Sequence, residues 1–472
     1  MKKRLTALFL TLALVLALGV NAMSADGDAA ESAGETAQAT EEIEPVEAAA
    51  EAADAETGEE AEAEEPPAPE PDAEGTLSFA NLGSRMKESY YPLLALKESI
   101  DDVESHDYEW RYENLRKRLN DIASAQWAMI SGVSAAAAAS SAAAAEAAAT
   151  GDLSAAVASI AATPTMDNSA YSAMQQGYDT YRDQFDGIKD GTVQKDDEDA
   201  LWKYHNGENL AVIGGESLYI QIKSYQAQDE AITRGLAQLD RTIRELELRQ
   251  ELGQVSAVTV EQLKATRAQT ASQQQTLRTG IDAMLLTLKS MVGAELGEPL
   301  TLGALPKVTE AQLAAMELEA DLKKAKEASY SLYDAKKQID DFRKGTYKDV
   351  IDLFGSNEKI FEVSQVKHAL KAMQINYEDT EQTYELNFRT LYAQVKDAAQ
   401  VLEAKRAALV SQEKSYAVSA LKYEQGSISA NALADAKDEL ASAKDDVSSA
   451  ERDLFSKYHT YQWAVEYGIL NS

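Results

Sequence analysis

The sequence predicts an all-α protein in which two internal repeats each form long antiparallel helical hairpins, or coiled coils, with at most a short reduced β region. Three observations support this fold class. The chain is rich in Ala, Glu, Lys and Leu and has only 9 Pro and 24 Gly in 472 residues, a composition typical of long helices. Two sequence matches recur at one offset, and apolar residues then recur every seven positions.

The internal repeat rests on two short matches. The first pairs Tyr219 with Tyr392, an offset of 173 residues (392 minus 219). The second pairs Gly253 with Gly426 and gives the same offset, 173. Two separate matches at one offset, with no gap between them, indicate duplication.

The segments on either side of each glycine have the period of a helix. Heptad spacing specifies a left-handed coiled coil. Each glycine lies where one apolar run ends and the next begins, so we expect Gly253 and Gly426 to form the tight turns of two hairpins, where a positive φ costs least. In the second copy the heptad positions are Val395, Leu402, Leu409, Tyr416 and Tyr423 before the turn, and Leu433, Leu440, Val447, Leu454 and Tyr461 after it.

A weaker match sets the size of an insertion. Tyr91 resembles Tyr330 in its local sequence at an offset of 239 (330 minus 91), so the first copy holds 66 extra residues (239 minus 173). They include the Ala- and Ser-rich run and the polar stretch that follows it. The predicted organisation is a signal peptide (1–22), an acidic disordered linker (23–76), a first helical repeat (77–298) with the insertion at about 134–199, and a second helical repeat (299–472).

The N-terminal residues predict export. A basic start and the apolar run 5–20 are typical of a secretory signal. No later stretch approaches ~18 uninterrupted apolar residues, so we expect no helical membrane anchor. Residues 26–75 hold 19 acidic residues and no Lys or Arg. Such a segment cannot bury enough apolar surface to fold, and we interpret it as a solubilising spacer.

Composition argues against several functional classes. A formal net charge of -34 disfavours binding to nucleic acid. The absence of Cys removes thiolate metal sites and Cys nucleophiles. No phosphate-binding loop, dinucleotide fingerprint or nucleophile elbow is present. We therefore expect no enzyme activity, no cofactor and no metal site, since the four histidines also lack ligand spacing: His106, His205, His368 and His459.

Several segments resemble the TolC-type outer-membrane efflux family. Its hairpin tip, Tyr-x-x-Gly followed by small and apolar residues, is matched at 423–429 and, without the Tyr, at 248–256. Residues 77–92 are similar to the family's opening helix, and 293–300 to the bridge that closes a first repeat. With the duplication, the resemblance covers most of residues 77–472.

The resemblance implies a homotrimeric helical conduit in the cell envelope, at the outer membrane and periplasm, that works with a periplasmic adaptor and an inner-membrane pump. Some members carry acidic aperture residues past the second glycine, and Asp435 matches one such position, whereas Ala432 stands at the neighbouring one. The positions matching the adaptor-contacting tips are Leu252, Gly253, Gln254 and Val255 in the first copy, and Gln425, Gly426, Ser427 and Ile428 in the second.

One feature of the family is not evident in this sequence. Family members add a β-hairpin per repeat to a membrane barrel, yet 209–215, 346–354 and 359–366 show no clear strand alternation. The sequence thus indicates a divergent member with a reduced or missing barrel, whose membrane contact, if any, is made through the reduced barrel. The alternative function is an exported coiled-coil structural or interaction protein of the envelope without channel activity.

Overall fold

The computed structural model describes residues 71–73, 75–163 and 165–470, all within one compact unit, Ala68–Ser472. The predicted signal peptide and most of the predicted linker lie outside the described residues. The end of that linker is ordered, because Asp72 accepts hydrogen bonds from the Ser78 amide and the Asn81 side chain, both at 3.0 Å.

The first repeat is helical apart from one two-residue strand. Strand β1 (Thr76–Leu77) pairs in parallel with β2 (Thr301–Leu302), which follows the repeat and ties its two ends together. The helices are α2 (Phe79–Ser89), α3 (Tyr91–Glu104), α4 (Tyr108–Ala149), α5 (Leu153–Ala161), α6 (Asn168–Lys189), α7 (Thr192–Glu251) and α8 (Ala257–Met291).

The second repeat is helical from α9 to α14. The all-α fold class is therefore confirmed, and the short pair β1–β2 is the β structure of the described residues. The elements are α9 (Glu310–Ala314), α10 (Leu318–Ala328), α11 (Tyr330–Phe342), the π-helical turn η1 (Arg343–Tyr347), α12 (Lys348–Phe354), α13 (Phe361–Glu424) and α14 (Ala430–Tyr467).

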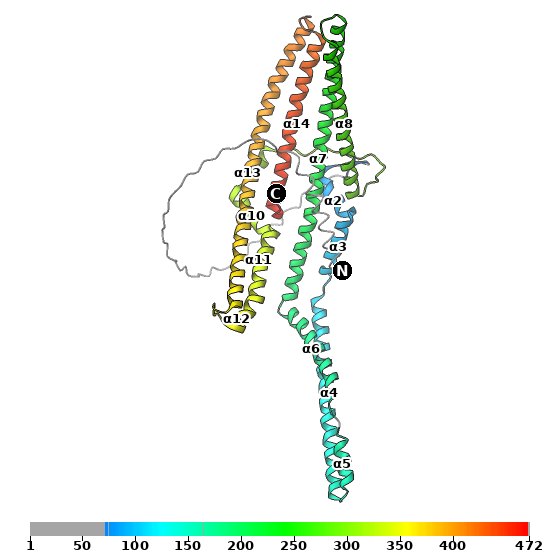
Figure 1. The fold of residues 1–472 in the computed structure, drawn as a ribbon, viewed down its shortest axis with the longest axis vertical. Helices are drawn as coiled ribbons and strands as arrows, with labels where there is room; N and C mark the ends of the chain where they lie inside the picture. The colour runs from blue at the N-terminus through cyan, green and yellow to red at the C-terminus, as the bar shows by residue number, and fades with distance from the viewer. Residues whose placement is uncertain (1–70, 74, 164, 471–472) are drawn as a thin grey trace, which may run out of the picture. The chain divides into compact units, whose positions relative to one another are not determined.

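Four long helices lie side by side in one layer. Helix α7 pairs with α8, α13 pairs with α14, and α7 also contacts α14. The order across the layer is therefore α8, α7, α14, α13 (Figure 1). Helices α8 and α13 form the two edges, each with a long partner on one side.

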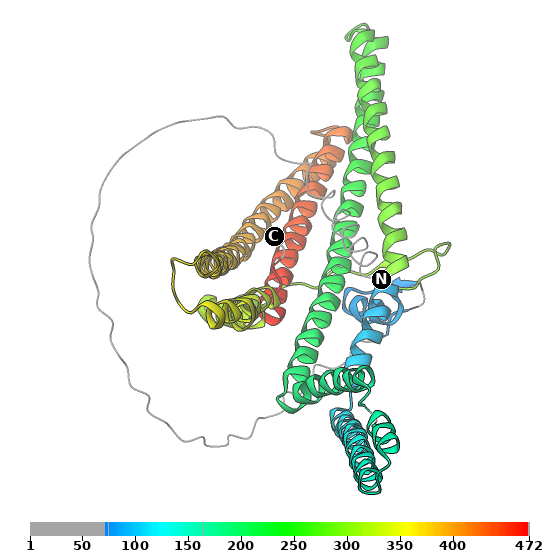
Figure 2. The same cartoon turned by 60° about the horizontal axis from the view of Figure 1, so that its bottom comes forward.

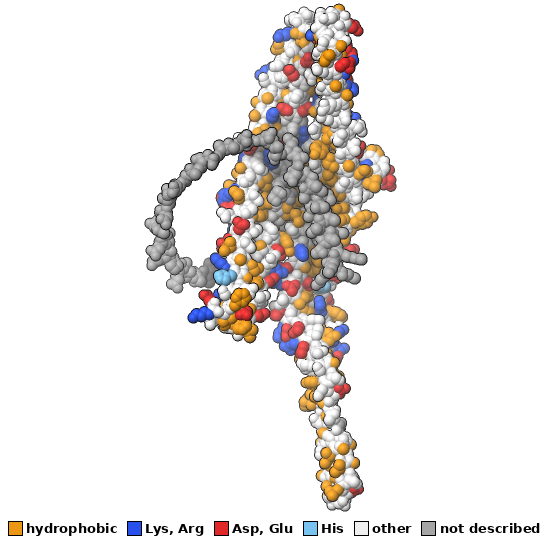
Figure 3. All heavy atoms as spheres, in the orientation of Figure 1, with side chains coloured by type: hydrophobic (Ala, Val, Ile, Leu, Met, Phe, Trp, Pro, Cys, Tyr) orange, Lys and Arg blue, Asp and Glu red, His pale blue; other side chains and the backbone are white. Residues whose placement is uncertain are grey.

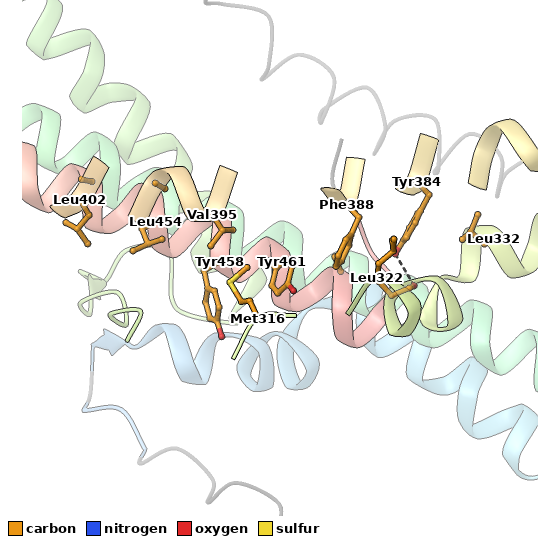
Figure 4. Close-up of a cluster of buried hydrophobic side chains, with 14 residues drawn as sticks. Met316, Leu322, Leu332, Tyr384, Phe388, Val395, Leu402, Leu454, Tyr458 and Tyr461 are labelled. Carbon is orange, nitrogen blue, oxygen red and sulfur yellow. Dashed lines mark hydrogen bonds between the residues drawn. The ribbon is translucent and has the colours of Figure 1, made fainter. Parts of the chain in front are cut away.

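Each repeat has its own core near the base of its hairpin. In the first repeat, α2 and β1 pack on α7 and α8 through fully buried residues such as Leu82, Tyr219 and Leu288. In the second, α10 packs on α13 and α14 around Phe388 and Val395, which are also fully buried (Figure 4). Phe455 of α14 belongs to the first core, so the two repeats share a contact.

A buried tyrosine bonds to two backbone carbonyls in each repeat. The Tyr219 hydroxyl donates to the carbonyl oxygens of Leu77 and Gly303, both at 3.0 Å. Burial, with a contribution from the charge of Asp72, raises the pKa of Tyr219 to about 12, so the hydroxyl keeps its proton. Tyr219 thus joins the segment before α2 to the segment after β2.

A second buried tyrosine, Tyr384, bonds in the second repeat. Its hydroxyl donates to the carbonyls of Ala325 in the last turn of α10, at 3.0 Å, and of Gly468 at the end of α14, at 3.1 Å. Burial raises its pKa as well. These acceptors are not the counterparts of those of Tyr219, so the pairing of Tyr219 with Tyr392 stays a prediction. Tyr392 packs beside Tyr461 at the edge of the second core.

The weaker sequence match is confirmed by backbone geometry. Tyr90 separates α2 from α3 with φ -79° and ψ 112°, and Ser329 separates α10 from α11 with φ -76° and ψ 107°. These breaks are 239 residues apart (329 minus 90), as predicted. Both repeats therefore begin with the same kinked helix pair.

The connections below these pairs differ between the repeats. In the first repeat, α4, α5 and α6 stand between α3 and α7, with α5 and α6 packed along α4 (Figure 2). In the second, η1 and α12 make a short bend at Gly345. The segments where strands could have formed, 188–213 and 346–366, contain helices in both repeats, with a short turn at 355–360.

Helix α4 also departs from expectation. Within the described residues it is the helix whose length and composition would suffice to cross a membrane, with a mean hydropathy of 1.4 over its most apolar window. The sequence expectation concerned uninterrupted apolar residues, and α4 has Ser, Gln and Gly among its apolar ones, so its mean hydropathy was not foreseen. The level is reached through many alanines rather than through a run of large apolar side chains.

We expect Tyr219→Phe and Tyr384→Phe to destabilise the fold by about 1–3 kcal/mol each, because each removes two hydrogen bonds from a buried hydroxyl to backbone carbonyls. The midpoint of urea unfolding, followed by circular dichroism, measures this. The matched control is Tyr91→Phe, since Tyr91 is 83% exposed. Equal midpoints for all three variants would show that the tyrosine bridges contribute no stability.

Candidate functional site

The two hairpin turns have the same backbone geometry. Gly253 has φ +70° and Gly426 has φ +69°. The Gly253 amide donates to Gln250 at 2.9 Å and the Gln254 amide to Arg249 at 2.8 Å. This pair of bonds is the Schellman motif, which ends a helix and turns the chain back.

The second turn repeats this pattern. The Gly426 amide donates to Tyr423 at 2.9 Å and the Ser427 amide to Lys422 at 2.8 Å. Ser256 and Ser429, three residues after each glycine, then cap the returning helices by accepting from amides three residues further on. The predicted offset of 173 therefore holds at the tips.

Most side chains of the predicted tip residues face solvent. Leu252, Gln254, Gln425 and Ser427 are exposed. Val255 and Ile428 occupy equivalent positions, and both are half-buried beside their turns. Sequence reasoning missed the exposed apolar residues just outside the turns, which widen the apolar surface of both tips: Leu248, Val258, Leu421 and Tyr423.

Ion pairs join the hairpins between α7 and α14. Arg234 pairs with Asp445, and Arg241 pairs with Asp438. As the residue number rises by seven along α7, the number of its partner falls by seven along α14, so the two helices are antiparallel. The antiparallel register, carried on by the 3.1 Å bond from Asn431 to Glu245, brings the two tips to the same level.

The predicted aperture residue Asp435 belongs to this seam. Its carboxylate lies 3.5 Å from the Arg241 guanidinium, and its side chain is 54% exposed. Asp435 is therefore a partly neutralised carboxylate near the tips. Sequence reasoning missed its partner Arg241, which also pairs with Asp438, although Arg234 and Arg241, like Asp438 and Asp445, are seven residues apart.

Other ion pairs hold each hairpin together. Asp240 on α7 pairs with Arg267 on α8 at 2.9 Å, and Asp229 pairs with Arg278 at 2.8 Å. Hydrogen bonds from these arginines lower the pKa of both carboxyls. These two ion pairs join helices of the same hairpin, α7 and α8. The seam pairs instead join one hairpin to the other, through α7 and α14.

A groove, here called the polar groove, lies between α7 and α14 and reaches the seam residue Asp445. Its volume is about 540 Å³. Hydroxyl and carboxylate groups and one guanidinium line it together with Ile220, Ala227 and Ala231, so water and ions can contact its polar groups. The polar residues lining it include Ser224, Gln228, Glu230, Asp446, Ser449, Arg452, Asp453 and Ser456.

A histidine network reinforces the contact between the hairpins. The Glu216 carboxylate of α7 lies 2.8 Å from His459 Nε2 and accepts from Trp463 Nε1 at 2.8 Å. Both partners are on α14. Within the described ranges, no group of three His, Asp or Glu side chains is arranged to hold a metal ion.

Comparison with known proteins matches part of the chain to a family. Residues 346–459 match the family model of the outer membrane efflux protein. The matched segment runs from η1 through the second tip into α14. The resemblance to the efflux family is therefore confirmed over this part of the chain. No curated protein matches the sequence.

Solved outer-membrane channels match parts of this chain at low identity and low TM-score. The outer membrane protein VceC from Vibrio cholerae shares 13% identity with a TM-score of 0.38, over 59% of this chain and 76% of VceC. The CmeC channel from Campylobacter jejuni shares 13% with a TM-score of 0.36, over 61% and 68%. The MtrE channel from Neisseria gonorrhoeae shares 15% with a TM-score of 0.35, over 59% and 73%.

We expect Gly426→Val to disrupt the second tip. A β-branched residue at φ +69° costs at least about 1–2 kcal/mol, because its Cβ meets the following carbonyl. Hydrogen exchange of the backbone amides at positions 426 and 427 should therefore be faster in the variant than in the wild-type protein. The matched control is Gly280→Val in α8, where the added Cβ meets nothing within 4 Å and φ is helical. Equal exchange in both variants would contradict a strained turn.

Proposed function

We propose that this chain is a subunit of an envelope efflux conduit, a homotrimeric helical channel that exports substrates together with a periplasmic adaptor and an inner-membrane pump. The family match over residues 346–459 supports the class of protein. The observation that carries the proposal is the layer of four helices, which has two unsatisfied edges.

Exposed apolar side chains lie along both edge helices. A coiled coil buries one stripe of each helix, and further apolar positions on its surface indicate another partner. Val258 and Leu286 of α8 are 65% and 47% exposed. On α13 the exposed residues are Ile375, Leu386, Val401, Val410, Val418 and Leu421.

Joining edges of different kinds produces a ring. If α13 of one copy pairs with α8 of the next, the contact is heterologous, and such contacts close into a cyclic assembly when the rotation allows it. Three copies, the number that the family resemblance implies, would place four long helices per subunit around one axis. The polar groove between α7 and α14 then suits a water-filled lumen.

The tips are the proposed partner surface. The two tips lie at the same level along α7 and α14. The residues of the proposed surface are those of the two turns: Leu252, Gly253, Gln254 and Val255 in the first hairpin, and Gln425, Gly426, Ser427 and Ile428 in the second. Their exposed apolar residues would bind the adaptor. Asp435 is the proposed aperture residue, and the ties between Arg241, Asp435 and Asp438 would hold that end narrow.

Covalent closure tests the ring. Leu421 lies five residues before Gly426, and Val258 lies five residues after Gly253, so both are at the same level from the tips. The chain has no native Cys. A double variant, Leu421→Cys with Val258→Cys, treated with a short bis-maleimide, should give a covalent trimer on a denaturing gel.

Each single Cys variant is the control and should remain monomeric on the gel, because neither edge faces its own kind. A ladder extending beyond three chains would indicate an open filament. A purified protein that is monomeric or dimeric would favour the alternative, an exported coiled-coil structural protein without channel activity.

Breaking the seam should widen the conduit. Asp438→Asn removes the charge that holds Arg241, and we expect conductance across a planar bilayer to rise severalfold as the tips separate. The matched control is Arg267→Gln, which breaks an ion pair within one hairpin. Conductance that is unchanged in Asp438→Asn, or raised equally in the control, would contradict a gate at the seam.

A further inference from the structure

We propose that α4 and α5 form a docking element, here called the stem hairpin, that packs against the stem hairpins of the other copies. The three hairpins would form a helical bundle at the end of the ring opposite the tips. The inference rests on the proposed function for the ring that brings three copies together. Its occupant is a second copy of this chain, and four features of the stem hairpin support that choice.

The first feature is an apolar stripe that its own chain leaves mostly exposed. Leu153, Val157 and Ile160 of α5 are 72%, 66% and 63% exposed. They are spaced by four and then three residues, which puts them on one helix face at the spacing of a coiled-coil seam. A stripe with this spacing fits another helix.

The second feature is the weak interior of the stem hairpin. Its buried contacts between α4 and α5 involve Ala144 and Ala156, each 7% exposed. Alanine buries little apolar area. A helix as short as α5, with 9 residues, is marginal in water unless tertiary packing supports it. The most apolar window of α4 is only 6% buried. The hairpin therefore needs further cover.

The third feature is the absence of charge. Residues 122–145 and 153–166 contain no Asp, Glu, Lys or Arg, whereas a solvated helix face normally carries many. Charges resume at the base of α4, where Arg116, Lys117 and Arg118 follow one another. Figure 3 shows this change from charged side chains near α6 to mainly apolar and uncharged ones towards α5.

The fourth feature argues for protein rather than lipid as the cover. Two contacts fix how the neighbouring helices are aligned along α4. Gln126 of α4 donates to Gln175 of α6 at 3.1 Å, and Ala144 of α4 lies in the contact region with Ala156 of α5. Asp167, which caps α6 through the amides of Ser169 and Ala170, therefore lies partway along the stem hairpin.

A bilayer around the stem hairpin would have to take up that carboxylate and the backbone groups freed between α5 and α6. Both are costly in hydrocarbon. A neighbouring helix covers the stripe and leaves Asp167 in water. The many Ala and Ser residues of α4 also let helix backbones approach closely.

The stem hairpin is attached to the rest of the chain at two helix breaks. One lies between α3 and α4, at 105–107, and the other is Gly191 between α6 and α7, with φ +81°. His106 Nδ1 and the Tyr108 hydroxyl both bond to the Asp197 carboxylate of α7, at 2.8 and 2.9 Å. These bonds fix the base of α4 against α7, so the stem hairpin extends from the same defined point in every copy.

Disulfide trapping tests the proposal in the full mature chain. Val157→Cys should form interchain disulfides on mild oxidation, because residues on a shared axis bring their Cβ atoms within the ~3.5–4.5 Å that a disulfide needs. The matched control is Ala158→Cys, also exposed but turned to another face of α5. We expect at least tenfold more covalent dimer from Val157→Cys. Equal yields from the two variants would overturn the proposal.

Charge substitution provides a second measurement. Leu153→Asp, Val157→Asp and Ile160→Asp together should raise amide exchange in α4 and α5 at least tenfold, while the mass of the assembly stays unchanged. The control triple is Ser154→Asp, Ala158→Asp and Ala161→Asp, which adds the same charge on exposed positions of α5 and should leave exchange near the wild-type rate. Equal exchange in both triples would overturn the proposal.

Vesicles of phosphatidylethanolamine and phosphatidylglycerol distinguish the other occupant. Three results together would assign the stripe to lipid and overturn the proposal. The wild-type protein would float with these vesicles, the triple Asp variant of Leu153, Val157 and Ile160 would not, and Val157→Cys would form no interchain disulfide. A trimer with the Val157→Cys disulfide but without conductance would support the stem bundle and count against the channel function alone.

Discussion

A long helix in a two-helix coiled coil buries one stripe, and two such hairpins laid side by side still leave two edges open. This limit governs the architecture of the whole chain. The described helices α8, α7, α14 and α13 meet as a layer, while large buried side chains concentrate near the hairpin bases, around Tyr219 and Phe388. Towards the tips, ion pairs and small residues hold the helices, and apolar side chains remain on the edges. In the proposed conduit, other copies of the chain cover these edges.

The tips were predictable because one residue type dictates their geometry. A left-handed backbone position costs least for glycine, and Gly253 and Gly426 occupy such positions in matching turns. Their serine caps follow at the same offset. The seam was less accessible to sequence analysis. The heptad spacing of Arg234 and Arg241 is visible in the sequence, yet it acquires meaning only once α14 is known to lie beside α7.

The tyrosine bridges could not be predicted from the sequence. Tyr219 and Tyr384 each donate to two backbone carbonyls near the base of a hairpin. Backbone carbonyls have no sequence signature, so only the fold reveals these hydrogen bonds. The apolar character of α4 escaped notice for another reason. Alanine contributes moderately at many positions, and a search for large apolar residues overlooks its sum.

Electron cryomicroscopy of the purified mature protein tests the closure of the layer most directly, in a section taken midway between the tips and the hairpin bases. We expect a closed ring of helices, four from each of three copies, around a solvent-filled centre faced by α7 and α14. A filled bundle without a lumen, or an isolated layer whose α8 and α13 edges face solvent, would contradict it.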